Sequence, residues 1–370
     1  MRNHDTASRP RTRVSGDPAV PPPDSGHHPP TAAPRRDLHP DVLTRELLAP
    51  YLHDQATDFL RSLRVHRESG QDPQGAADAA GAARALRGSA RRISATLHTF
   101  RPLTDTGWAD TLRSELAWLS GVLAREHAYA ARLNRLLEAL NRLSGAGAGP
   151  VPVPPARGGG KSEPGSSLTV GAARAGALLE RQLTLARTRA HSAALQALGS
   201  SRFHAVADAV ALLASDVPLG PAAAAPAAEV LAPLATGAEQ RLREAVAALP
   251  LGRAAHPYNA EALVHGLAPA PSSEAQDAPW HHVRLLLRLH RYAREVIAAP
   301  ADTLTAARAL DRHRDAAEAA TAAASAARTP RIAPATAYAL GVLHADQRHE
   351  VEAARFAFQQ AWQPLPAAAP

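Results

Sequence analysis

The chain of 370 residues contains no cysteine. Disulfide bonds, a nucleophilic thiolate and cysteine-ligated zinc or iron are therefore excluded. Aromatic residues make up only 4% of the sequence and β-branched residues are scarce, so the core must consist mainly of Leu, Ala and Val. Because alanine and leucine favour helices, whereas strands are rich in aromatic and β-branched residues, this composition favours an all-α fold.

Long apolar runs are missing too. No uninterrupted run approaches the roughly 18 residues that a membrane span needs. The first residues alternate charge, proline and histidine, without the apolar stretch of a secretory signal. We therefore expect a cytoplasmic protein.

Lysine is almost absent, since Lys161 is the single lysine among 41 basic residues, and the net charge is +7. The planar guanidinium of arginine donates two hydrogen bonds to one phosphate and stays charged at neutral pH. The basic excess therefore indicates an anionic partner. A genomic bias toward arginine codons would raise the same count, and composition does not separate the two explanations.

Composition and helical periodicity divide the chain into four segments. We expect a disordered basic tail rich in Pro and His at 1–40, a first helical half at 43–144, a flexible Gly/Pro linker at 145–168 and a second helical half at 169–365. The periodic pattern predicts helices near 43–69, 76–100, 108–128, 129–143, 170–198, 202–215, 237–248 and 280–298, with two or three more before Trp362. Whether 108–128 and 129–143 are one helix or two is left open by the pattern. The fold is predicted to be two helical bundles in tandem.

Two of these helices carry basic side chains at matching spacings, namely Arg84, Arg87 and Arg91 in the first half and His281, Arg284 and Arg288 in the second. Offsets of three and seven residues place each set on one helical face. The second set continues to Arg291 among apolar neighbours. Such charges must be neutralised by carboxylates or by a bound anion, because like charges repel and lose hydration. Spacing alone leaves both explanations open.

At these residues the sequence resembles the CHAD (conserved histidine α-helical domain) family. The segment WHHVRLLLRLHRYAREV from Trp280 is similar to the family's signature helix, with His281, Arg284, Arg288, Arg291 and Tyr292 in register. In the first half, RALRGSARRISATLHTFRPL resembles the equivalent helix and retains Arg87, Arg91, Arg92, Phe100, Arg101 and Pro102. Arg84 stands where the family has its histidine.

Further segments extend the resemblance to about residues 43–365. Arg125 to Ala128 reads REHA where the family has Arg-Asp-x-Asp, so one acidic position has become alanine. LDRHRDAAEAA from Leu310 resembles the family's second acidic helix and keeps Asp315, and the stretch from Ala339 to Trp362 fits its last helix.

The resemblance implies two pseudo-symmetric helical bundles around a basic cleft that binds inorganic polyphosphate, with no catalysis, cofactor or metal. It also implies a cytoplasmic location, at polyphosphate granules where these form. The expected binding residues are Arg84, Arg87, Arg91, Arg92, His281, Arg284, Arg288, Arg291 and Tyr292. His281 has two interpretations: a phosphate donor when protonated, or a neutral histidine that satisfies a neighbouring carboxylate.

Rival functions have weaker signals. The 18 histidines suggest a metal, yet neither His281-His282 with His290 nor His344 with His349 has a recognised ligand spacing. A phosphate-binding Gly-x-x-x-x-Gly-Lys loop and a nucleophile elbow are absent. A non-specific nucleic-acid binder remains an alternative, although few aromatics are present for base stacking. A helical scaffold that has lost its ligand is the other.

Overall fold

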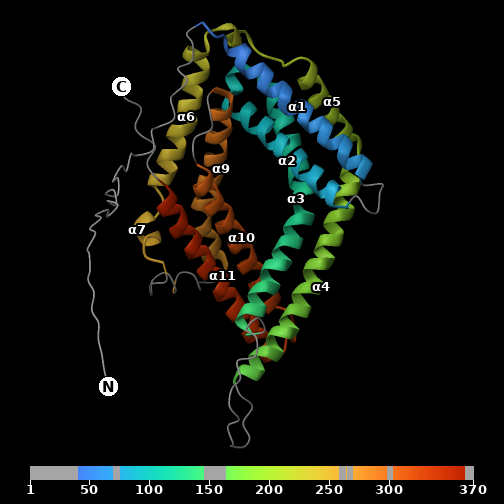
Figure 1. Ribbon diagram of the computed structural model, residues 1–370, viewed down its shortest axis with the longest axis vertical. Helices are drawn as coiled ribbons and strands as arrows, with labels where there is room; N and C mark the ends of the chain where they lie inside the picture. Colours follow the sequence, from blue (N-terminus) through green and yellow to red (C-terminus); the bar gives the residue numbers. More distant parts are fainter. Residues whose placement is uncertain are drawn as a thin grey trace, which may run out of the picture. The chain divides into compact units, whose positions relative to one another are not determined.

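The computed structural model describes residues 41–69, 76–145, 164–257, 264, 270–297 and 303–362. Within these ranges every regular element is a helix, and the only strand-like pairings are isolated bridges of Leu43 with Pro226 and Thr104 with Leu219 (Figure 1). The predicted all-α fold class is confirmed. Among these residues, no helix combines the length and the apolar character needed to cross a membrane. The predicted tail at 1–40 lies outside the described residues, as does most of the predicted linker.

The α-helices are α1 (Thr44–Ser69), α2 (Ala76–Thr99), α3 (Thr106–Leu143), α4 (Pro164–Leu198), α5 (Ser201–Ser215), α6 (Ala227–Ala247), α7 (Leu251–Ala254), α9 (Ala270–Ile297), α10 (Leu304–Ala327) and α11 (Pro334–Ala361). Two short 3-10 helices, η1 (Arg101–Leu103) and η2 (Pro221–Ala224), connect them. The predicted helices at 108–128 and 129–143 form one continuous helix, α3.

Local sequence explains several helix ends. The carboxylate of Asp105 caps α3 by accepting a hydrogen bond from the backbone N–H of Trp108 at 2.8 Å. The hydroxyl of Ser200 caps α5 in the same way. Pro102 has no N–H to extend α2 and instead lies at the start of η1.

Two helices begin well before their predicted starts. α6 begins at Ala227 and passes through Pro233, and α9 begins at Ala270 and passes through Pro279. Each proline lacks the N–H for the bond to residue i−4, which disfavours it inside a helix. In the structure, packing of α6 and α9 on each other outweighs that loss. The longer α9 places Asp277 inside the helix, about one turn before His281.

Two apolar clusters hold the helices that carry the basic sets. One joins α1, α2, α3, α5 and α6 and contains the fully buried Phe59, Phe100 and Phe203. The other joins α6, α9, α10 and α11 around Trp280 and Phe358. Because α2 and α9 also contact each other, the two basic helices lie next to one another.

A third cluster joins helices from both sides of the predicted linker. Leu136 and Leu140 of α3 pack with Leu179 of α4 and Leu343 of α11. Alanines of α10 complete the cluster, and α3 and α4 run side by side (Figure 1). Helices α4 and α5, which lie in the predicted second half, therefore pack on α3 and α1 of the predicted first half. The division of the chain into four segments, at 1–40, 43–144, 145–168 and 169–365, stays a prediction.

Candidate functional site

A cleft of about 470 Å³ lies between α2, α3, α9 and α10. We call it the arginine cleft. Its lining residues are Arg87, Arg91, Ser120, Gly121, Ala124, Arg284, Leu287, Arg288, Arg291, Tyr292, Ala307, Asp311, Arg314 and Asp315. Six of these are arginines, and they come from both halves of the sequence. The structure thus brings together most of the two basic sets.

Three arginines of the cleft have carboxylate partners. Arg284 of α9 donates from Nε to Oδ1 of Asp311 at 2.6 Å. On α10, Arg314 pairs with the adjacent Asp315, with Glu318 3.8 Å away. Arg291 lies 3.7 Å from Glu295, one helical turn further along α9. This part of the arrangement matches the ion-pair explanation that residue spacing left open.

The other three, Arg87, Arg91 and Arg288, have no carboxylate within ion-pair distance in the part of the chain that the structure describes. The Nε of Arg87 is buried and has no hydrogen-bond partner there. Burial lowers the pKa of Arg87, and the neighbouring charges of Arg91 and Arg314 lower it further. Burial, followed by the charge of Arg284, lowers the pKa of Arg288 to about 10. These cations are desolvated and repel one another, so an anion between them would be stabilising.

Arg92 and Tyr292 occupy the wall between the cleft and α1. Arg92 donates from Nε to Oε2 of Glu295 at 2.9 Å, and the hydroxyl of Tyr51 donates to the same oxygen at 3.0 Å. The guanidinium carbons of Arg92 and Arg291 lie 5.2 and 5.1 Å from the ring centre of the buried Tyr292. Tyr292 therefore keeps Arg291 in place through cation–π contact. Arg92 does not line the cleft.

His281 precedes Arg284 by about one turn of α9, and its ring centre is 5.3 Å from that of His313 in an edge-to-face arrangement. Its pKa is lowered, mainly by burial and further by Arg284 and Arg314, whereas Asp277 and Glu318 oppose the shift. The neutral imidazole is therefore favoured near neutral pH. His281 does not line the arginine cleft, and its predicted binding role stays a prediction.

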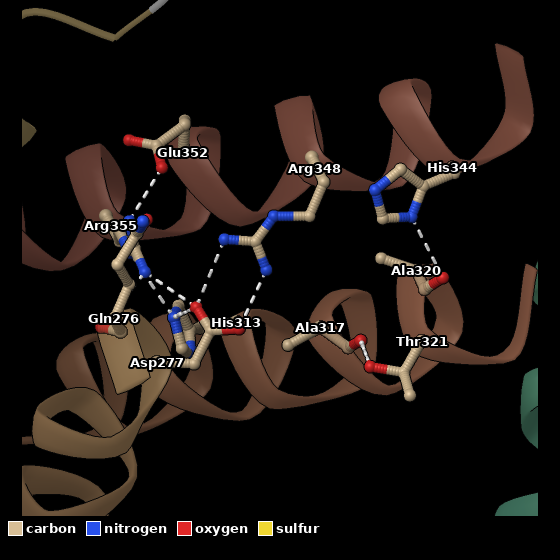
Figure 2. Close-up of polar contacts among 10 residues, drawn as sticks. All are labelled: Gln276, Asp277, His313, Ala317, Ala320, Thr321, His344, Arg348, Glu352 and Arg355. Carbon is tan, nitrogen blue, oxygen red and sulfur yellow. Dashed lines mark hydrogen bonds and ion pairs between the residues drawn. The ribbon is translucent and has the colours of Figure 1, made fainter. Parts of the chain in front are cut away.

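His313 belongs to a buried ionic network of α9, α10 and α11, drawn in Figure 2. Asp277 accepts hydrogen bonds from Arg348 at 2.7 Å and from Arg355 at 2.6 Å, and Arg355 also donates to Glu352. Burial raises the pKa of the Asp277 carboxyl, but its contacts with His313 and Arg348 outweigh burial and hold that pKa well below its usual range. The network fixes α9 and α10 against α11. It thereby positions Arg284 and Arg314, which follow on the same helices.

A second groove of about 450 Å³ continues from the cleft along α3. We call it the lateral groove. It shares Arg87, Ala124, Arg314 and Asp315 with the cleft and adds Arg125, His127, Ala128, Tyr129, Ala131, Arg132, Arg135 and Glu318. Ala128, where the family has an acid, leaves one carboxylate fewer in this groove.

Sequence reasoning missed two cleft residues of α10, Arg314 and Asp311. The signal was present, because Asp311, Arg314, Asp315 and Glu318 follow one another at helical spacings and share a face. Alternating charge of this kind is usual on solvated helix surfaces, so the pattern alone did not indicate a site. Arg84 is exposed and lies outside the arginine cleft, in neighbouring pockets.

Metal ligation finds no support in the described part of the chain. There, no group of three or more His, Cys, Asp or Glu side chains is placed to hold a metal ion.

Comparisons with known proteins agree with this architecture. The family model of the CHAD domain matches residues 55–302. The solved structure of PptA from Streptomyces chartreusis is similar, with 63% sequence identity and a TM-score of 0.71 over 87% of this chain and 99% of that chain. A search of the curated proteins finds no match.

Proposed function

The chain belongs to the CHAD domain family, and on that premise we propose that it binds inorganic polyphosphate in the arginine cleft without catalysing a reaction. The proposed binding residues are the cleft arginines of the two basic sets, Arg87, Arg91, Arg284, Arg288 and Arg291, together with Arg314. The binding roles predicted for Arg84, Arg92 and His281, which do not line the cleft, stay predictions. The family is associated with polyphosphate. A location in the cytoplasm, at polyphosphate granules, stays part of the proposal.

The observation that carries the proposal is a group of three arginines, Arg87, Arg91 and Arg288, that have no carboxylate partner among the described residues. They face one cleft and come from α2 and α9. One guanidinium group donates two parallel hydrogen bonds to a phosphate. Such charge-assisted bonds strengthen where water is partly excluded. A chain of phosphates supplies several such oxygens at short intervals.

The continuity of the two grooves supports a polymeric ligand. Arg87 and Arg314 line both the cleft and the lateral groove, and Arg125, Arg132 and Arg135 extend the basic surface along α3. The aromatic side chains along this path are two tyrosines, of which Tyr292 is buried. Few ring faces are therefore present for base stacking, which favours polyphosphate over single-stranded nucleic acid.

The test is a titration of the full chain with long-chain polyphosphate and with duplex DNA of matched charge over a salt series. We expect polyphosphate binding to persist at salt concentrations that abolish DNA binding. The double variant Arg87→Gln/Arg288→Gln should bind polyphosphate at least roughly tenfold more weakly, since each charge-assisted bond contributes about 1.5–3 kcal/mol. Arg64→Gln is the matched control, because Arg64 is exposed and pairs with Glu68 on α1.

Each other outcome points to a different function. Equal affinity for both polymers with a steep salt dependence would indicate a non-specific polyanion or nucleic-acid binder. No binding of either polymer by a folded chain would indicate a helical scaffold that has lost its ligand, with the arginines serving only ion pairs.

A further inference from the structure

A pocket of about 770 Å³ lies beside the arginine cleft, between α1, α2, α3 and α4. We call it the side pocket. Most of its wall is apolar and includes Ala83 of α2, Leu123 of α3 and Ala194 and Leu198 of α4. Its volume lies within the roughly 300–1,000 Å³ of small-molecule sites. Inorganic polyphosphate has no apolar group that would contact such a wall.

Basic side chains surround this wall. Arg67 of α1 and Arg84 of α2 line the pocket, and neither has a carboxylate within ion-pair distance among the described residues. Glu126, the acidic residue in the lining, is already held by His191 at 2.9 Å and by Arg187 at 3.8 Å. The pocket therefore combines an apolar wall with positive charge, which suits an anion that has a non-ionic body.

Arg87 connects the side pocket to the arginine cleft, because it lines both. Its buried Nε has no hydrogen-bond partner among the described residues. A phosphate bound at Arg87 would have one neighbouring site rich in arginine and one with apolar walls. The arrangement fits a phosphate chain that ends in an organic group.

We propose that the side pocket binds the nucleoside of a nucleoside polyphosphate, whose phosphates extend past Arg87 into the arginine cleft. This inference rests on the proposed function, since it places the phosphates in the same cleft. A nucleoside fits better than an acyl chain because His66, His127 and Ser69 introduce polar groups among the alanines. Guanidinium planes such as that of Arg84 also stack on flat rings. Arg84, which departs from the family histidine, would contribute here.

The experiment compares ATP with inorganic tripolyphosphate by calorimetry on the full chain, without divalent cations. Both ligands carry three phosphates, so a difference reports on the nucleoside. We expect ATP to bind at least about tenfold more tightly. Ala83→Phe should fill the side pocket and remove this gain while leaving tripolyphosphate affinity unchanged. Ala85→Phe is the matched control, since Ala85 is an exposed residue of the same helix that lines a different groove.

Three results would overturn the inference. One is equal binding of ATP and tripolyphosphate. The second is a gain for ATP that survives Ala83→Phe, because that gain would not come from the side pocket. The third is an equal gain for dodecyl phosphate over inorganic phosphate, because that gain would not require a nucleoside. Long-chain polyphosphate is titrated in parallel. If it binds while ATP shows no gain, the side-pocket inference fails and the proposed function stands; if it does not bind, the proposed function itself fails.

Discussion

Asp311 neutralises Arg284, which a polyanion could otherwise bind. Its Oδ1 accepts a hydrogen bond from Nε of Arg284 at 2.6 Å. We expect Asp311→Asn to bind polyphosphate roughly three- to tenfold more tightly at low salt, because the cleft loses a negative charge and Arg284 is released. Stability should change by less than about 1 kcal/mol, since the Asp311 side chain is 54% exposed. Calorimetry at low salt measures the change in affinity. Glu68→Gln, which breaks an exposed pair on α1, should leave affinity unchanged, and an equal gain there would contradict the role of Asp311.

His313 makes the stability of the fold dependent on pH. Burial lowers its pKa from 6.5 to about 4, with Arg355 and His281 acting in the same direction and Asp277 opposing them. The unfolded chain therefore binds a proton near pH 6.5 that the folded chain accepts only near pH 4. The free energy of unfolding should fall as pH drops through this window. Below it, protonation of Asp277 should lower the stability further, because the folded state keeps that carboxyl charged.

Denaturant titrations between pH 7 and pH 4.5 measure this effect. His313→Gln removes the titrating group, so the slope of stability against pH should decrease by up to about 1.4 kcal/mol per pH unit. Some slope should remain, since burial also lowers the pKa of His281 and His290. His282→Gln, at an exposed position of α9, is the control. An unchanged slope in His313→Gln would contradict the assignment.

At the scale of helices, two glycines are expected to respond oppositely to alanine. A Cβ at Gly121 of α3 meets no atom of the described residues within 4 Å, so Gly121→Ala should stabilise the fold by about 0.5–1 kcal/mol through helix propensity. A Cβ at Gly171 of α4 would overlap the carbonyl oxygen of Ala335, where α4 and α11 approach closely. Gly171→Ala should therefore lower the melting temperature. Thermal unfolding followed by circular dichroism distinguishes the two, and stabilisation by both changes would contradict the close approach.

The helices were predictable from the sequence where apolar periodicity is strong, whereas some of their ends were not. The run from Leu43 and the capped start of α3 carry clear local signals. The early starts of α6 and α9 depend on packing that outweighs Pro233 and Pro279, and local sequence contains no information about that packing. Distances along the chain likewise do not show that α4 packs on α3.

For the site, helical spacing predicted which arginines share a face of α2 and which share a face of α9. Which face meets the other is decided by tertiary packing, so spacing alone did not separate Arg87 and Arg91, in the cleft, from Arg84, which lies outside it. The same limit applies to His281, whose neighbour His313 comes from another helix. Family resemblance pointed to α2 and α9, both of which line the arginine cleft, and the structure added Arg314 from α10.

At the scale of the whole molecule, the two adjoining grooves predict that affinity depends on the length of the phosphate chain. Under the proposed function the arginine cleft alone would hold tripolyphosphate, whereas a long chain would also reach Arg125 in the lateral groove. Arg125 is exposed and has no carboxylate within ion-pair distance among the described residues, so a change there should not disturb the fold. We therefore expect Arg125→Gln to weaken long-chain polyphosphate several-fold and to leave tripolyphosphate affinity unchanged.

The salt dependence provides an independent measure of the same contact. Affinity falls with salt, and each phosphate contact that is lost makes the slope of log affinity against log salt concentration shallower by roughly 0.7–0.9. Arg125→Gln should show this decrease with long-chain polyphosphate but not with tripolyphosphate, and Arg64→Gln should show it with neither. An equal loss for both chain lengths would mean that Arg125 acts on the cleft itself. No loss for either would confine polyphosphate to the arginine cleft, because the lateral groove would then contribute no phosphate contact.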